Sequence, residues 1–264
     1  MTVMRFEAGG RRFQADFARP LSIAIPLDFA GPQPACFGAP PATARPLFAA
    51  QHVKCDRLSL VPHCNGTHTE CVGHVTDEPV AVANQLPGGM HVALLVTVDP
   101  ASPASVREDS DPFPADGDRL ITATALRTVM AKHTGPVPQA LIVRTSRPGD
   151  APARAYRGPA PAPYLSRQAA AWLVDNGIEH LVLDLPSADR AEDGGRLTAH
   201  RVFFGLPAGS RRAAEARRPR ATITELAWVG PAIDDGYFLL DLQIPAFLAD
   251  AAPSRPLLYA LCPE

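Results

Sequence analysis

The sequence predicts an α/β protein, and three observations support that class. Residues 91–98 and 140–145 are short runs of aliphatic and β-branched residues, which is typical of buried strands. Residues 166–176 have the features of a helix, and this helix leads directly into a third apolar run at residues 181–185. A helix followed at once by a buried strand is a unit of α/β domains. With 264 residues the chain could form one large domain or two small ones, and we expect a single domain over residues 1–264.

The other elements follow from local patterns. The helix at residues 166–176 has an N-cap in Ser166, and Gly177 follows its last residue. A second helix is expected at residues 122–132. Residues 28–49 are rich in Gly, Pro and Ala, which predicts an ordered loop that either contributes to a binding site or has no role. Further strands are expected at residues 21–27, 57–61, 237–244 and 256–261. Further irregular segments are expected at residues 99–118, 148–163 and 189–199.

The composition is that of an ordinary globular protein, with 46% hydrophobic and 20% charged residues. A formal net charge of −2 and a pI near 6.4 give no electrostatic reason to expect nucleic acid or membrane as partner, so we expect a small-molecule substrate. The first residues lack the features of a signal peptide, and no apolar run approaches the ~20 residues of a membrane span. We therefore expect a cytoplasmic protein. Five cysteines, an odd and small number, predict reduced thiols.

Metal-binding side chains gather in residues 62–74, which hold three His, two Cys and one Glu. Proline and glycine residues within the segment exclude a long helix, so we expect extended or turn backbone. In extended backbone the side chains alternate between two faces. His63 and Cys71 would then point to one face. The opposite face would carry four potential ligands: Cys64, His68, Glu70 and His74.

Common signatures of other site types are absent from the sequence. It has no G-x-G-x-x-G, Walker or G-x-S-x-G motif, and no C-x-x-C pair of a zinc finger. A thiol redox role for Cys64 and Cys71 is disfavoured because their side chains would point apart. The histidines outside this segment and before residue 200 are interpreted as ordinary polar residues: His52, His91, His133 and His180. A metal site with an open position, which can make a nucleophile from water, is the remaining interpretation.

Three blocks of the sequence resemble a known family. Residues 65–74, N-G-T-H-T-E-C-V-G-H, are similar to the signature H-x-G-T-H-x-D-x-P-x-H of the metal-dependent cyclase family, whose best-known member is kynurenine formamidase. Residues 177–189 are similar to the family's block G-I-x-x-V-G-I-D-T-x-S-x-D, and His200 stands where the family has a downstream metal-binding His. Residues 222–226 are similar to the element I-x-E-N-L, whose Glu is a ligand. The blocks occur in matching order, and the resemblance spans about residues 21–262.

The resemblance implies a swivelling β/β/α domain that holds one or two divalent ions, with zinc expected first and manganese second. It implies a metal-dependent hydrolase that uses metal-activated water on a small amide, formamide or cyclic amide. A homodimer or a higher homo-oligomer is also implied. The alternative is a catalytically silent relative that keeps the fold and binds a small ligand or a structural metal.

Carried over residue by residue, the resemblance implies six metal ligands: Cys64, His68, Glu70, His74, His200 and Glu225. His74 and Glu225 are the predicted catalytic residues, with His74 moving a proton. Glu70 and Glu225 would anchor a metal and would bridge two ions in a two-metal site. Cys64 replaces the first His of the family and Glu70 replaces its Asp, and a thiolate would favour zinc. His63 is the alternative first ligand if the backbone twists.

Overall fold

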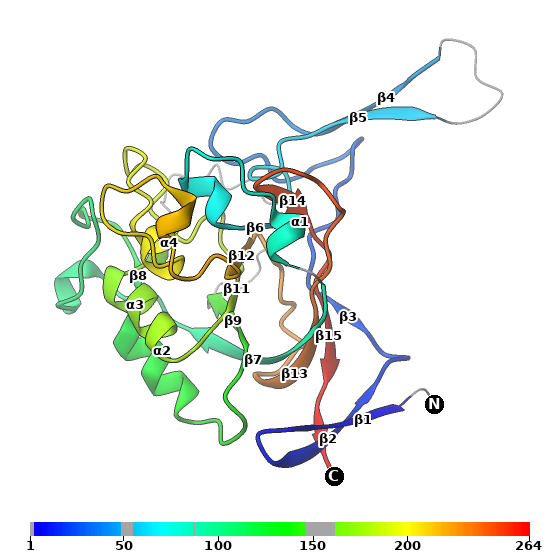
Figure 1. Cartoon of the computed structure of the whole chain (residues 1–264), viewed down its shortest axis with the longest axis vertical. Coiled ribbons are helices and arrows are strands. Elements are labelled where there is room, and N and C mark those ends of the chain that lie inside the picture. The colour runs from blue at the N-terminus through cyan, green and yellow to red at the C-terminus, as the bar shows by residue number, and fades with distance from the viewer. Residues whose placement is uncertain (1–2, 49–54, 87, 146–161) are drawn as a thin grey trace.

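The computed structural model describes residues 3–48, 55–86, 88–145 and 162–264. Within these residues, nine strands form one sheet in the order β14-β6-β12-β11-β9-β7-β13-β15-β3 (Figure 1). Their bounds are β3 (Leu21–Ser22), β6 (His68–Glu70), β7 (Met90–Val98), β9 (Ala140–Thr145), β11 (His180–Leu183), β12 (Thr222–Glu225), β13 (Gly236–Asp241), β14 (Ala251–Pro253) and β15 (Leu257–Ala260). The expected α/β class is confirmed.

The centre of the sheet is parallel and its edges are antiparallel. Strands β7, β9, β11 and β12 run parallel to one another, whereas β6, β13, β14, β15 and β3 each pair in antiparallel fashion with their neighbours. The sequences of the parallel strands are nearly continuous apolar runs because both faces of these strands are buried. The expected strands at residues 91–98, 140–145 and 181–185 correspond to β7, β9 and β11.

Three helices cover one face of this sheet: α2 (Ala123–Met130), α3 (Arg167–Asp175) and α4 (Thr198–Phe203) (Figure 1). Their apolar side chains and those of the sheet form one core that includes Leu94, Val143, Leu183, Ile223, Leu126, Leu173 and Phe203. The expected N-cap of α3 is confirmed, since Oγ of Ser166 accepts a hydrogen bond from the backbone N–H of Ala169 at 2.9 Å. The other face of the sheet is buried in a second core with Ile23, Leu95, Ile142, Val182 and Leu258.

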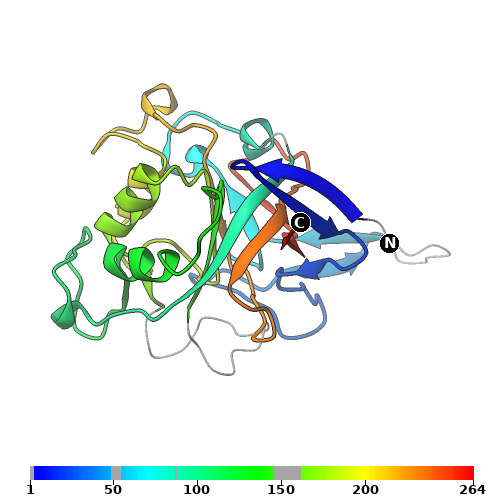
Figure 2. The same ribbon diagram turned by 90° about the horizontal axis from the view of Figure 1, so that it is seen from below.

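Smaller elements surround the main sheet. They are β1 (Val3–Ala8), β2 (Arg11–Asp16) and β16 (Cys262–Pro263) in a three-stranded sheet, β4 (Thr43–Pro46) with β5 (Asp56–Ser59), β8 (Leu120–Ile121) with β10 (Tyr164–Leu165), the helix α1 (Val82–Gln85), and the 3₁₀ helices η1 (Val72–Val75), η2 (Pro103–Ser105) and η3 (Ala213–Glu215). Figure 2 shows α2 and α3 in green on one side of the molecule and the blue β1–β2 hairpin on the opposite side. The β4–β5 hairpin extends away from the sheet in Figure 1.

Several expected segments differ from the structure. Only Leu21–Ser22 of the expected strand at residues 21–27 is a strand, and Ala24 adds an isolated bridge to Ala227. The expected loop at residues 28–49 contains β4. Most of the expected irregular segment at residues 148–163 lies outside the described residues. None of the described helices is long and apolar enough to cross a membrane.

Candidate metal centre

The site lies where β11 and β12 end, at the carboxyl end of the parallel strands. Strand β6 lies antiparallel beside β12, and its register places His68 directly opposite Glu225. Residues directly opposite on paired strands point to the same face, and Glu70 shares that face because it is two residues from His68. Short-range alternation and strand pairing therefore bring three potential ligands together. The carboxyl end of parallel strands is also where open α/β sheets bind ligands.

His200 reaches the same point from α4, which follows β11. Its Nε2 lies 2.6 Å from Oε1 of Glu70 and 3.4 Å from Oε1 of Glu225. Nε2 of His68 lies 3.4 Å from Oε2 of Glu225, so the two oxygens of Glu225 face two different imidazoles. All four residues are at most 3% exposed. Residues from distant parts of the sequence thus meet in one buried cluster.

The segment before β6 is a turn, and this changes which side chain enters the site. Oδ1 of Asn65 accepts a hydrogen bond from the backbone N–H of Val61 at 2.8 Å, and the N–H of Cys64 donates to the carbonyl of Val61 at 3.0 Å. Gly66 has φ +83, and a Cβ there would lie 2.9 Å from a side-chain carbon of Leu27. Extended backbone begins only at β6, so the alternation of faces does not apply to the residues before it.

His63 consequently takes the place that the sequence pattern gave to Cys64. Its Nδ1 lies 2.9 Å from Oε2 of Glu70. Among the described residues, three groups have ligand atoms close enough to share an ion: His63, His68 and Glu70; Glu70, His74 and His200; and His63, His74 and Asp250. Cys64 and Glu225 belong to none of them, although the oxygens of Glu225 lie 3.4 Å from His68 and His200. Burial and the negative charge of Glu225 raise the pKa of the Cys64 thiol, which disfavours the thiolate that binds metals.

His74 returns to the site through the 3₁₀ helix η1. Its backbone N–H donates to the carbonyl of Cys71 at 3.0 Å, and its Nε2 lies 4.0 Å from Oε2 of Glu70. Gly73 is required in this turn, since a Cβ at that position would lie 2.4 Å from the carbonyl oxygen of Val80. The side chain of His74 is 27% exposed, so this imidazole lies at the solvent side of the cluster.

Three of the imidazoles each place one ring nitrogen against an oxygen of the protein. The contacts are His68 Nδ1 to the carbonyl of Gly66 at 3.1 Å, His200 Nδ1 to Oδ2 of Asp189 at 2.6 Å, and His63 Nε2 to Oδ2 of Asp250 at 2.9 Å. A ring nitrogen facing an oxygen acceptor carries the proton, so the second nitrogen of a neutral ring offers a lone pair. This is the arrangement that orients histidine ligands in metal sites.

The opposite ring nitrogens of the same three imidazoles are buried and have no hydrogen-bond partner among the described residues. They are Nδ1 of His63, Nε2 of His68 and Nε2 of His200, and both carboxylate oxygens of Glu70 share this property. Nδ1 of His63 and Nε2 of His200 lie 2.9 and 2.6 Å from the oxygens of Glu70 without forming an aligned hydrogen bond. Buried polar atoms are normally hydrogen-bonded, so this convergent group requires an explanation. These atoms fall into two groups that share Glu70, and a divalent cation in each group would satisfy them. Imidazole with carboxylate is a donor set that suits zinc or manganese. The residues therefore fit the implied metal.

The charges of the site act strongly on one another. Burial favours a higher pKa for Glu70, but the positive charges of His74 and His200 hold its pKa well below the ordinary value. Burial favours a lower pKa for His63, but its contacts with Asp250 and Glu70 raise that pKa to about 10. Burial also favours a lower pKa for His200, and the charge of Glu70 raises it well above the ordinary value. A cation that binds here must displace these protons.

Two carboxylates beside the cluster were not assigned from the sequence. Asp189 accepts hydrogen bonds from the backbone N–H of Ala199 at 2.7 Å and of His200 at 3.1 Å, in addition to His200 Nδ1. It stands in the second block that resembles the cyclase family, and that position was the available signal. Asp250 contacts His63 and His74, and no motif in the sequence marks it.

Comparison with known proteins identifies the family. The sequence model described as Putative cyclase matches residues 16–190, more than half of the chain, and the chain belongs to this family. A comparison with curated proteins finds no match. The expected resemblance to metal-dependent cyclases is thereby confirmed.

Solved structures with similar folds share little sequence with this chain. One is described as a potential metal-dependent hydrolase with cyclase activity, with 17% identity, 91% of this chain and 97% of that chain covered, and a TM-score of 0.59. Isatin hydrolase A from Labrenzia aggregata, bound to benzyl benzoate, has 15% identity, 92% and 93% coverage, and a TM-score of 0.58. An isatin hydrolase bound to the product analogue thioisatinate has 17% identity, 85% and 83% coverage, and a TM-score of 0.54. These likenesses confirm the swivelling β/β/α fold of the cyclase type.

Proposed function

We propose that the protein is a metal-dependent hydrolase of a small amide, with cyclic amides and aryl formamides as the substrate classes to test first. The observation that carries this proposal is the set of buried nitrogens and oxygens that converge around Glu70 without aligned hydrogen bonds. Family membership supports it, and so does the likeness to isatin hydrolases, because isatin is a cyclic amide. Kynurenine formamidase activity is the formamide variant of the same chemistry.

The proposed ligands are His63, His68, Glu70, His74, His200 and Glu225. Two of the three-residue groups share Glu70, and the oxygens of Glu225 face His68 and His200. These contacts support a bridging role for the two carboxylates if two ions bind. A divalent cation held here would polarise the substrate carbonyl and lower the pKa of water toward ~7. Zinc is our first choice and manganese our second.

His74 is the proposed proton-transfer residue. It is the most exposed of the proposed imidazole ligands, and its two ring nitrogens face Glu70 and Asp250 at 4.0 and 3.5 Å. A cavity of about 540 Å³ is lined by Gly73 and Asp250, the neighbours of His74 in sequence and in space. Glu225 is fixed by a hydrogen bond of 2.7 Å from the backbone N–H of Ala188, which suits an anchoring role.

The test combines metal content with turnover. Protein purified without chelator is analysed by mass spectrometry and then assayed on cyclic amides and N-formyl aryl amides, with and without added zinc or manganese. We expect at least one ion per chain and turnover that a chelator abolishes. Less than stoichiometric metal together with no turnover after metal addition would favour the catalytically silent alternative.

We also propose that the protein is cytoplasmic and forms a homodimer or a higher homo-oligomer, with no nucleic acid or membrane as partner. Exposed apolar side chains on and next to the β4–β5 hairpin support self-association: Leu47, Phe48 and Leu58. Light scattering coupled to size-exclusion chromatography tests this, and a monomer at micromolar concentration would contradict it.

A further inference from the structure

Asp250 is held beside the site by strand pairing far along the chain. It immediately precedes β14, whose first residue, Ala251, is the register partner of Glu70 on β6. Its backbone carbonyl accepts a hydrogen bond from the N–H of Cys71 at 3.0 Å. The backbone of Asp250 is thus fixed relative to β6 and to the start of η1. The family match ends at residue 190, so the following assignment depends on the geometry alone.

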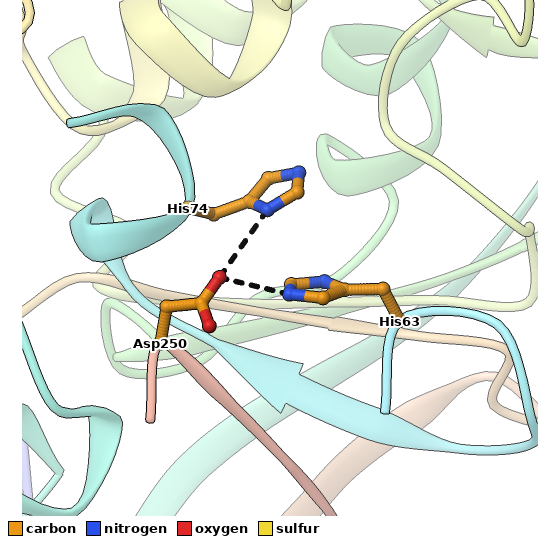
Figure 3. Close-up of side chains that lie close together, drawn as sticks. All are labelled: His63, His74 and Asp250. Carbon is orange, nitrogen blue, oxygen red and sulfur yellow. Dashed lines mark hydrogen bonds and ion pairs between the residues drawn. The ribbon is translucent and has the colours of Figure 1, made fainter. Parts of the chain in front are cut away.

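One carboxylate oxygen of Asp250 faces two imidazoles (Figure 3). Its Oδ2 lies 2.9 Å from Nε2 of His63 and 3.5 Å from Nδ1 of His74. The two rings lie close together, with centroids 4.2 Å apart and planes at 31°, which allows one oxygen to reach both. The other nitrogen of each ring points to Oε2 of Glu70, at 2.9 Å for His63 and 4.0 Å for His74. Each imidazole therefore lies between two carboxylates.

The two sides of His63 differ in hydrogen bonding. Nε2 forms an aligned hydrogen bond with Asp250, whereas Nδ1 is close to Glu70 but has no hydrogen-bond partner among the described residues. In the neutral ring that binds a cation, the outer nitrogen holds the proton and the inner nitrogen offers its lone pair. This difference argues against an outer cation between Asp250 and the two rings, because Nε2 of His63 would then need its lone pair.

We infer that Asp250 is a positioning residue, which accepts the outer N–H of both His63 and His74 and keeps their inner nitrogens directed at the proposed cation site. This inference rests on the proposed metal-dependent function. The carboxylate also neutralises positive charge on the two rings. Because the side chain of Asp250 is 40% exposed, its replacement should leave the fold intact.

The experiment compares the full-length protein with Asp250→Ala and with Asp77→Ala as a matched control. Asp77 lines the same cavity, and its side chain pairs with Arg211 at 2.5 Å. Zinc affinity is measured by competition with a chromophoric chelator, and the number of ions per chain by mass spectrometry. We expect Asp250→Ala to weaken zinc binding about 10- to 100-fold with no change in the number of ions at saturation. Asp77→Ala should bind zinc as the unmodified protein does.

A second readout follows the ring protons directly. In the zinc-loaded protein, long-range ¹H–¹⁵N NMR should show His63 protonated at Nε2 and His74 at Nδ1, and Asp250→Ala should shift or average these signals. An unchanged affinity together with unchanged ring signals in Asp250→Ala would overturn the inference. Loss of one ion per chain in that variant would also overturn it, because Asp250 would then be a ligand. If the unmodified protein binds no divalent cation, the proposed function fails, and the inference fails with it.

Discussion

Replacement of Asp189 by Asn should lower both the stability of the protein and its affinity for zinc. Asp189 is 3% exposed, and its two oxygens serve different partners. Oδ1 accepts from the backbone N–H of Ala199, and Oδ2 accepts from both the backbone N–H and Nδ1 of His200. The first turn of α4 and the orientation of a proposed ligand therefore depend on one carboxylate.

An amide has a single acceptor oxygen and cannot satisfy both sides. If the oxygen faces His200, the NH₂ group opposes the N–H of Ala199, and an unsatisfied buried donor costs about 1–3 kcal/mol. If the NH₂ group faces His200, Nδ1 must accept and the ring proton moves to Nε2, where it blocks the inward lone pair. The loss of negative charge at the start of α4 adds about 0.3–1 kcal/mol. We expect the free energy of unfolding to fall by about 1–4 kcal/mol. We also expect zinc affinity to fall about 10- to 100-fold.

Urea denaturation of the metal-free protein measures the first effect and chelator competition the second. Asp193→Asn is the matched control, because Asp193 is 7% exposed and accepts from the backbone N–H groups of Gly195 and Leu197 in the same loop. This control should lose stability but keep its zinc affinity. Equal zinc affinity in Asp189→Asn and the unmodified protein would refute the reasoning.

Three further changes have distinct expected outcomes. Thr67→Val removes a buried hydroxyl that accepts from the backbone N–H of Ile25 at 2.8 Å and donates to the carbonyl of Leu226 at 2.5 Å. The free energy of unfolding, measured in urea, should fall by about 2–5 kcal/mol, and a loss below ~1 kcal/mol would contradict this. His63→Ala should weaken zinc binding at least ~10-fold and Cys64→Ala should not, whereas the reverse order would restore Cys64 as the ligand. Burial and nearby positive charge lower the pKa of His180 from 6.5 to about 3, so the unfolded chain binds an extra proton between these pH values and stability falls as the pH drops from 6.5 to 3. In urea titrations His180→Asn should reduce this loss of unfolding free energy by up to about 4 kcal/mol, and the control His133→Asn should leave it unchanged. Equal acid sensitivity of the two variants would show that His180 is not its source.

The elements that the sequence predicted correctly are those whose signals are local. Helix α3 has its cap, Ser166, immediately before it and Gly177 shortly after it, so both signals lie within one short segment. Strands β7 and β9 are apolar because helices cover one side of the sheet and a second core covers the other. Strands of two or three residues, such as β6 and β14, have no such pattern. They exist because neighbouring strands supply their hydrogen bonds, which a sequence pattern does not show.

The site residues also divide into those with a local sequence signal and those that depend on distant contacts. His68 and Glu70 share a face because both lie in β6, where the alternation of side chains holds. The prediction of Cys64 assumed that alternation in a segment that Asn65 closes into a turn, and the structure turns His63 inward instead. Asp250 could not be anticipated, since it lies 187 residues from His63 in the sequence and their contact depends on the pairing of β14 with β6.

The central claim is that the buried nitrogens and oxygens around Glu70 hold a divalent cation. The most direct test is a crystal structure of zinc-loaded protein with data collected on both sides of the zinc absorption edge. An anomalous peak about 2.0–2.2 Å from a carboxylate oxygen of Glu70 and from the inward nitrogens of neighbouring histidines is the predicted result. Zinc-loaded crystals without a peak in this cluster, or with their main peak elsewhere in the chain, would contradict the claim.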